Sequence, residues 1–125
     1  MVRESSKFTD KLDFLKASER LESVAKKTNI IYSEKFSKLY NNEVYLKPEN
    51  LQKTGAFKIR GAYNKISKMS EEDKEKGIIS ASAGNHAQGV AYSANKLGVK
   101  ATIVMPTTTP LIKVEGTKKY GVEVV

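Results

Sequence analysis

The sequence contains no cysteine and a single histidine, and these absences exclude several kinds of site. Without cysteine, the chain has neither a disulfide framework nor a thiolate metal site. The one histidine, His86, does not build a zinc site alone. No apolar run approaches the ~20 residues that span a bilayer, and the first residues lack the apolar stretch of a signal peptide. We therefore expect a cytoplasmic protein with no membrane partner.

Glycine is thinly spread, and this absence excludes a further kind of site. None of the eight glycines is adjacent to another or separated from it by one residue. The sequence therefore has no G-x-G-x-x-G pattern and no glycine run that would cradle a phosphate group.

The charge balance is basic, with a formal net charge of +8 over 125 residues. Such a balance can indicate a nucleic-acid or other anionic partner. The lysines, however, are scattered and mostly lie opposite the apolar positions of the predicted helices. No aromatic residues alternate with them as in a base-stacking surface. We therefore expect no nucleic-acid partner, and an anion- or nucleic-acid-binding module is a hypothesis that rests on charge alone.

The pattern of apolar residues predicts alternating helices and strands. Helices are predicted at residues 10–26, 55–69, 70–76, 85–97 and 110–120, and residues 33–40 are predicted as a brief helix or a turn. Strands are predicted at residues 43–47, 78–81, 100–105 and 122–125, and the strand at 78–81 reads as buried. This alternation predicts an α/β fold with an open parallel sheet flanked by helices.

Two short segments carry most of the functional information. The first, TGAFKIRGA at residues 54–62, places Lys58 at the start of a predicted helix. A lysine amine near a helix N-terminus, partly shielded from water, suits covalent catalysis on a carbonyl cofactor. On these residues alone, Lys58 is equally well an exposed lysine, and Phe57 is a core aromatic. Thr54 is a candidate cap for this helix.

The second segment, SASAGNHAQG at residues 80–89, predicts a turn from a strand into a helix. Small residues leave backbone N–H groups free at the helix N-terminus, where a carboxylate binds well. Asn85 is also typical of a helix N-cap. His86 by itself does not indicate a catalytic base.

Together, in this order and spacing, the two segments resemble the N-terminal part of the threonine/serine ammonia-lyases, or dehydratases. These enzymes belong to the tryptophan-synthase-like family that uses pyridoxal 5'-phosphate (PLP). The resemblance extends over residues 46–125 and, more weakly, back to about residue 17. It implies that Lys58 is the catalytic lysine, which holds PLP as a Schiff base and takes the α proton of the substrate. It also implies cofactor contacts from Phe57, against the ring, and from Asn85, to the ring hydroxyl.

The resemblance further implies a binding loop for the carboxylate of a small amino-acid substrate. The loop residues are Ser82, Gly84, Asn85 and His86. The implied reaction converts L-threonine to 2-oxobutanoate and ammonia. Ala83 stands where serine racemases, close relatives, have a serine that works as a second acid/base. Because alanine cannot transfer a proton, elimination is favoured over racemisation.

Several alternatives stay open at this point. The chain is also compatible with a serine dehydratase or serine racemase relative, or with a non-catalytic remnant or interaction protein. The sequence does not decide between threonine and serine, or between isoleucine biosynthesis and threonine catabolism.

The resemblance also implies an incomplete N-terminal portion of a two-domain PLP-enzyme fold. We expect residues 1–54 to belong to the larger domain and residues 55–125 to form much of the smaller one. The phosphate loop and the partner of the pyridine nitrogen are expected further along the fold, so we expect no activity from this portion alone. The full-length enzyme is expected to be a homo-oligomer. Exposed apolar faces are expected early in the chain, at Phe14, Leu21 and Val24.

Overall fold

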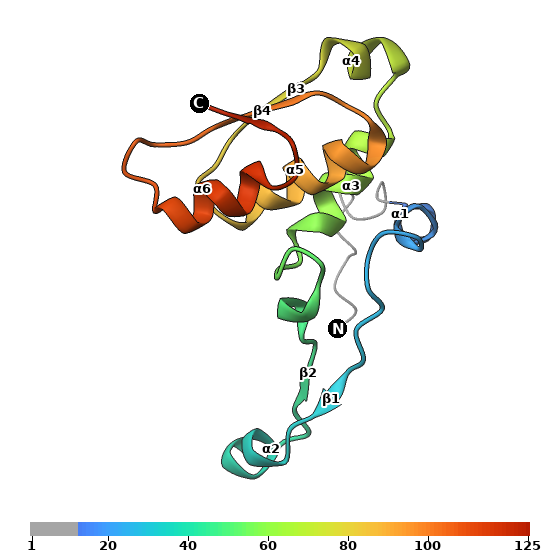
Figure 1. Cartoon of the computed structure of the whole chain (residues 1–125). Coiled ribbons are helices and arrows are strands. Elements are labelled where there is room, and N and C mark those ends of the chain that lie inside the picture. The colour runs from blue at the N-terminus through green and yellow to red at the C-terminus, as the bar shows by residue number, and fades with distance from the viewer. Residues whose placement is uncertain (1–12) are drawn as a thin grey trace, which may run out of the picture.

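A three-stranded parallel sheet organises the computed structural model, which describes residues 13–125 (Figure 1). The strands β3 (Ile78–Ala81), β4 (Ala101–Val104) and β5 (Glu123–Val124) lie in the order β3-β4-β5. Helix α5 (Asn85–Leu97) connects β3 to β4, and helix α6 (Leu111–Lys118) connects β4 to β5. The sequence-based prediction of an α/β fold with a parallel sheet flanked by helices is therefore confirmed.

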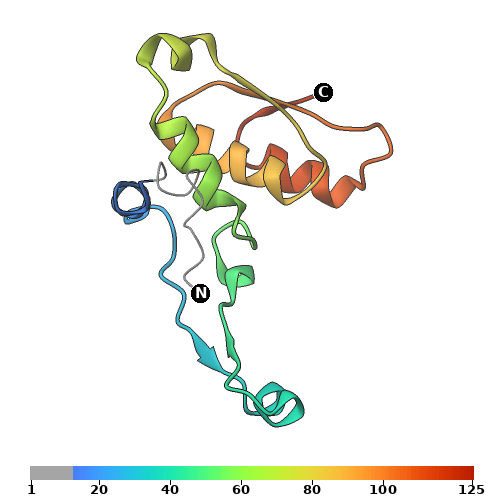
Figure 2. The same ribbon diagram turned by 180° about the vertical axis from the view of Figure 1, so that it is seen from behind.

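Helix α5 lies at the centre of the hydrophobic core. It packs against the sheet on one side and against helix α3 (Lys58–Ser67) on another, and α6 lies beside it (Figures 1 and 2). Its inward residues are small, which lets the neighbouring backbones approach closely. The buried cluster comprises Ala62, Ile66, Ala87, Val90, Ala94, Val99, Ala101, Ile103 and Met105.

The opposite face of the sheet is not covered by any described residues. Ile79 is 79% exposed and Val104 is 40% exposed. Thr102 and Glu123 share a hydrogen bond of 2.9 Å between β4 and β5. The prediction of a buried strand at residues 78–81 was therefore right about the strand and wrong about the burial. Successive residues of β3 point to opposite faces, and the described helices contact one face only.

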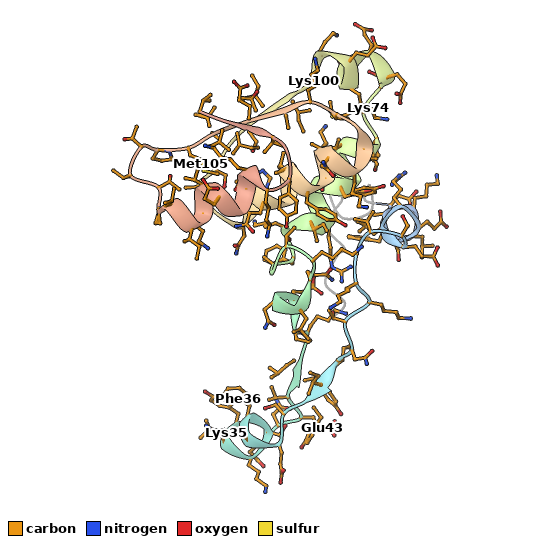
Figure 3. The ribbon with its side chains drawn as sticks, viewed as in Figure 1. Lys35, Phe36, Glu43, Lys74, Lys100 and Met105 are labelled. Atoms are coloured by element: carbon orange, nitrogen blue, oxygen red, sulfur yellow. The ribbon has the colours of Figure 1, made fainter. Side chains whose placement is uncertain are left out.

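Residues 31–46 form an arm that projects away from the sheet (Figures 1 and 2). Its strands β1 (Ile31–Tyr32) and β2 (Tyr45–Leu46) pair antiparallel, and helix α2 (Glu34–Tyr40) lies between them in the chain. Figure 3 places Phe36 and Glu43 at the far end of the arm. Asn41 ends α2 in the left-handed conformation, with φ 46°, which asparagine adopts more readily than most residues.

The first described helix, α1 (Phe14–Leu21), is shorter than the predicted helix at residues 10–26. Its predicted start lies outside the described residues, and the chain after Leu21 continues as turns. Leu21 and Val24 are 9% and 4% exposed, so the expectation that they are exposed was wrong. Both are buried because α1 packs against α3, where Arg20 Nη1 donates to Asn64 Oδ1 at 3.1 Å. Phe14 is 66% exposed, as expected.

The caps of helices α4 (Glu71–Lys76) and α6 differ. Ser70 caps α4 by accepting from the Asp73 N–H, and Gly77 ends that helix at φ 81°. Thr109, which precedes Pro110 at the start of α6, makes no capping bond, and its Oγ1 is buried without a partner. None of the described helices is both long and apolar enough to cross a membrane.

Candidate functional site

Lys58 is the first residue of α3, directly after a tight turn. The Gly55 N–H donates to the Gln52 carbonyl at 2.8 Å, and Gly55 has φ 71°, which favours glycine. No side chain caps α3. Thr54 instead donates to the Ala56 carbonyl at 3.4 Å, so the expectation that Thr54 caps this helix was wrong. The turn therefore delivers Lys58 to the helix start without a side-chain cap.

The Lys58 side chain is exposed and lies beside an exposed aromatic ring. Its Nζ is 4.8 Å from the ring centroid of Phe57. Phe57 is 57% exposed, so its interpretation as a core aromatic was wrong. A cation over an aromatic face is attracted by the ring quadrupole. The ring and the amine thus stand together at the surface, where both can reach a flat ligand.

Gly89 brings helix α5 against the backbone of Lys58. A Cβ added to Gly89 would lie 3.1 Å from the Lys58 carbonyl carbon and 3.2 Å from the Lys58 Cβ. Asn85 precedes Gly89 by one helical turn and therefore lies on the same face of α5. The structure thus brings the lysine to the face of α5 that carries Asn85. The sequence signal for this contact was a glycine inside a helical pattern, and its partner was not predictable.

Ser82, rather than Asn85, organises the turn between β3 and α5. Its Oγ accepts from the N–H groups of Gly84 and Ala87, each at 3.3 Å. Gly84 occupies the N-cap position and Asn85 makes no capping bond, so the N-cap interpretation of Asn85 was wrong. Ser82 and Gly84 are half-buried, whereas Asn85 and His86 are exposed.

This turn leaves groups free that suit a carboxylate. The N–H groups of Asn85 and His86 open the helix and have no partner within it. The Ser82 hydroxyl accepts two bonds and keeps its own proton to donate. The positive end of the α5 dipole adds to the attraction of an anion. Whether these residues bind a substrate carboxylate remains a prediction.

Glu49 is the centre of a polar cluster next to the first turn of α3. It lies in the short helix η2 (Glu49–Leu51). Arg60 donates from Nε to Glu49 Oε2 at 2.8 Å and from Nη2 to Oε1 at 2.9 Å. Thr28 donates to Oε1 at 2.9 Å. Arg60 above all, together with Thr28 and Gln52, lowers the pKa of Glu49 to about 2, and Glu49 raises the pKa of Arg60.

Gln52 extends this cluster to the chain that follows α1. Its Oε1 accepts from the Lys26 N–H at 2.9 Å, and its Nε2 donates to the Lys26 carbonyl at 2.7 Å. Through these bonds Glu49 and Gln52 organise the loop before Lys58. A groove of about 560 Å³ lies beside α1, and its lining includes Lys26 and Arg60 but not Lys58. The groove is therefore separate from the candidate site.

The described residues fit one part of a PLP site. They supply an exposed amine, a neighbouring aromatic ring and an anion-binding helix start. A glycine-rich phosphate loop is not among them, and no described group of His, Asp or Glu residues is arranged to hold a metal ion. The donors therefore fit the carbonyl end and ring of such a cofactor and the carboxylate of a substrate.

Comparisons with known proteins relate this chain to ammonia-lyases and racemases. An L-threonine ammonia-lyase from Thermotoga maritima is 51% identical over 113 residues, which is 90% of this chain and 28% of that protein. The solved structure of threonine deaminase isoform 2 from Solanum lycopersicum has a TM-score of 0.79 at 41% identity, covering 91% of this chain and 34% of that one. Maize serine racemase has a TM-score of 0.84 at 37% identity, covering 89% and 34%. The chain thus spans about a third or less of the length of these proteins.

The family assignment rests on a match that covers most of the chain. A family model described as pyridoxal-phosphate dependent enzyme matches residues 21–125. That range includes Lys58 and the turn from β3 into α5. This chain therefore belongs to the family of pyridoxal-phosphate-dependent enzymes.

Proposed function

We propose that the chain is the N-terminal segment of a PLP-dependent threonine ammonia-lyase, with Lys58 as its catalytic lysine. The observation that carries the proposal is the close contact at Gly89, which sets Lys58 against the face of α5 that also carries Asn85. The threonine ammonia-lyase from Thermotoga maritima, described above, supports the choice of substrate. Activity of the 125 residues alone is not part of the proposal.

In this proposal each group at the site has one task. PLP, when bound, supplies an electron sink that acidifies the α C–H bond of the substrate. Lys58 would hold the cofactor covalently, and its amine would take the α proton of the substrate. Phe57 would contact the cofactor ring, and Asn85 would hydrogen-bond the ring hydroxyl.

The carboxylate of the substrate binds at the start of α5. The N–H groups of Asn85 and His86 and the hydroxyl of Ser82 donate to it, and Gly84 leaves room for it. A Cβ added at Gly84 would meet no atom within 4 Å, so the space beside this residue is open to a ligand. Fixing the carboxylate orients the α C–H bond toward Lys58. Loss of the β hydroxyl as water and hydrolysis of the product then give 2-oxobutanoate and ammonia.

The first experiment uses the chain itself. The purified chain is titrated with PLP, reduced with borohydride and digested, and the labelled lysines are quantified by mass spectrometry beside a Lys58→Ala control. Saturable labelling concentrated at Lys58 would show that this segment alone directs the cofactor to Lys58. Because the segment carries no phosphate loop, weak retention of PLP is expected, and labelling spread evenly over the exposed lysines would mean that the cofactor is fixed by residues outside it. The same labelling is therefore repeated in the hybrid described next, where even labelling would contradict the assignment of Lys58.

A second experiment tests the reaction. This chain replaces the matching quarter of the Thermotoga maritima enzyme, and 2-oxobutanoate formation from L-threonine is measured with and without Lys58→Ala. The hybrid should be active and its Lys58→Ala variant inactive. A folded, PLP-loaded hybrid without activity on threonine would overturn the proposed substrate. Activity that survives Lys58→Ala would overturn the role of the lysine.

Serine racemisation is the second candidate, favoured by the similarity to maize serine racemase. Ala83 argues against it, because a methyl group cannot donate or accept a proton. The same hybrid, assayed for D-serine, should show elimination without racemisation. Substitution Ala83→Ser should raise the rate of racemisation relative to that of elimination. D-serine formation by the unsubstituted hybrid would favour the racemase over the ammonia-lyase.

A further inference from the structure

Three consecutive residues at the start of α3 point in three directions. Ile59 is fully buried and forms part of the interior. Arg60 extends to Glu49, which it contacts with two donors. Lys58 is exposed and lies beside Phe57. Successive side chains on a helix are about 100° apart, so holding two of the three fixes the direction of the third.

The Arg60–Glu49 pair resists rotation of this turn about the helix axis. A planar guanidinium that contacts both carboxylate oxygens is fixed in direction as well as in distance. The Arg60 side chain is 35% exposed and the Glu49 side chain 18%, so the pair is shielded from much of the solvent. The buried side chain of Ile59 alone would not prevent small rotations of this turn about the helix axis.

The far end of the pair is anchored outside α3. Thr28 donates to the Glu49 carboxylate, and Gln52 donates to it at 3.5 Å while also bridging the Lys26 backbone. Because no side chain caps α3, this anchor provides the side-chain constraint that a cap would otherwise supply. The start of α3 is therefore fixed to two other segments of the chain, η2 and residues 26–28.

We propose that Glu49 and Arg60 are positioning residues for Lys58, and that their two-point contact sets the direction in which the Lys58 amine leaves α3. The catalytic meaning of this placement rests on the proposed function. The placement itself does not, and it can be measured without PLP. Loss of the Arg60–Glu49 pair is expected to lower the catalytic rate strongly, because a small displacement of a reacting group slows the reaction strongly.

The test compares two variants with one control. Glu49→Gln removes the charge, and Arg60→Lys keeps the charge but loses the planar two-point contact. The control is Thr117→Val in α6, which removes the bond from the buried Thr117 hydroxyl to the Lys113 carbonyl and leaves the start of α3 unchanged. Unfolding curves are recorded for all three, and assays are run where each remains folded.

The first readout needs no cofactor. Acetylation rates of Lys58 and of Lys96, an exposed lysine on α5, are measured by mass spectrometry in the folded state. Glu49→Gln and Arg60→Lys should change the ratio of these rates at least severalfold, while Thr117→Val leaves it unchanged. The same ratio in all proteins would overturn the positioning role. An equal change in Thr117→Val would assign the effect to general destabilisation and would also overturn it.

The second readout separates this proposal from the proposed function. In the Thermotoga maritima hybrid, Glu49→Gln should lower kcat severalfold with a smaller change in KM, and the PLP absorbance band of Lys58 should shift or weaken. An altered acetylation ratio, together with a folded hybrid whose Lys58 never reacts with PLP, would uphold the positioning and overturn the proposed function. An unaltered acetylation ratio with normal PLP labelling of Lys58 would overturn the positioning role and uphold the proposed function.

Discussion

Substituting Gly89 by alanine tests the close approach of α5 to Lys58. Alanine gains about 1 kcal/mol over glycine in a helix interior. At Gly89 the added Cβ would lie 3.1 Å from the Lys58 carbonyl carbon and 3.2 Å from both the Ile59 nitrogen and the Lys58 Cβ. The first two are backbone atoms and the third is attached directly to the backbone, so none of them can rotate away as the end of a side chain would. Overpacking of this kind costs about 1–3 kcal/mol. We therefore expect Gly89→Ala to range from neutral to about 2 kcal/mol less stable than the parent chain.

Gly61 provides the matched control for this experiment. It lies inside α3, and a Cβ added there would meet no atom within 4 Å. Gly61→Ala should therefore stabilise the chain by about 0.5–1 kcal/mol. The two variants should differ by about 0.5–3 kcal/mol in the free energy of unfolding from urea titrations followed by circular dichroism. Equal stabilisation by both substitutions would refute the close contact, and with it the observation on which the proposed site depends.

Three further predictions concern single polar side chains. Glu49 has a folded pKa of about 2 against an ordinary 4.5, so its stabilisation is present above pH 4.5 and is lost as the pH falls toward 2. This stabilisation amounts to at most about 3 kcal/mol at pH 7, of which about 2 kcal/mol is lost by pH 3. Glu49→Gln should therefore flatten the dependence of the free energy of unfolding on pH between pH 4.5 and about pH 3. An unchanged dependence would contradict the pairing of Glu49 with Arg60. Ser82→Ala removes the acceptor for two N–H groups and should cost about 1 kcal/mol in urea unfolding; no loss would mean that Ser82 does not hold the turn. Thr109→Val removes a buried hydroxyl that has no partner and should leave the melting temperature unchanged or raised, and a loss above about 1 kcal/mol would reveal a bond that Thr109 makes in solution.

Local signals in the sequence were sufficient for most of the elements. The helix at residues 85–97 was predicted with the same ends as α5, because Gly98 adopts φ 67° there and stops the helix. Ser70 and Gly77 bound α4 for similarly local reasons. The helix at 55–69 was predicted too long, since residues 52–57 use their hydrogen bonds in turns before α3 begins.

The errors arose where a residue's role depends on distant segments. Ile79 was expected to be buried because its side chain is apolar, but its exposure depends on which helices cover the sheet. Phe57 was expected in the core, yet its place beside Lys58 turns it outward. The proximity of Gly89 to Lys58 joins residues 31 positions apart, and no local pattern encodes it. The division of the chain at residues 54 and 55 and the roles of the site residues stay predictions.

The arm has a consequence for the order in which parts of the chain open. Its two strands pair over only two residues each, and Ile31, Tyr32 and Tyr45 are all at least half exposed. A two-stranded ribbon on its own is marginal in water, whereas α5 is held by a continuous core. Amide hydrogens of the arm should therefore exchange through local opening, long before those of α5, which exchange only when the whole body unfolds. The chain would thus behave as two cooperative units, with the Glu49 cluster at the boundary between them.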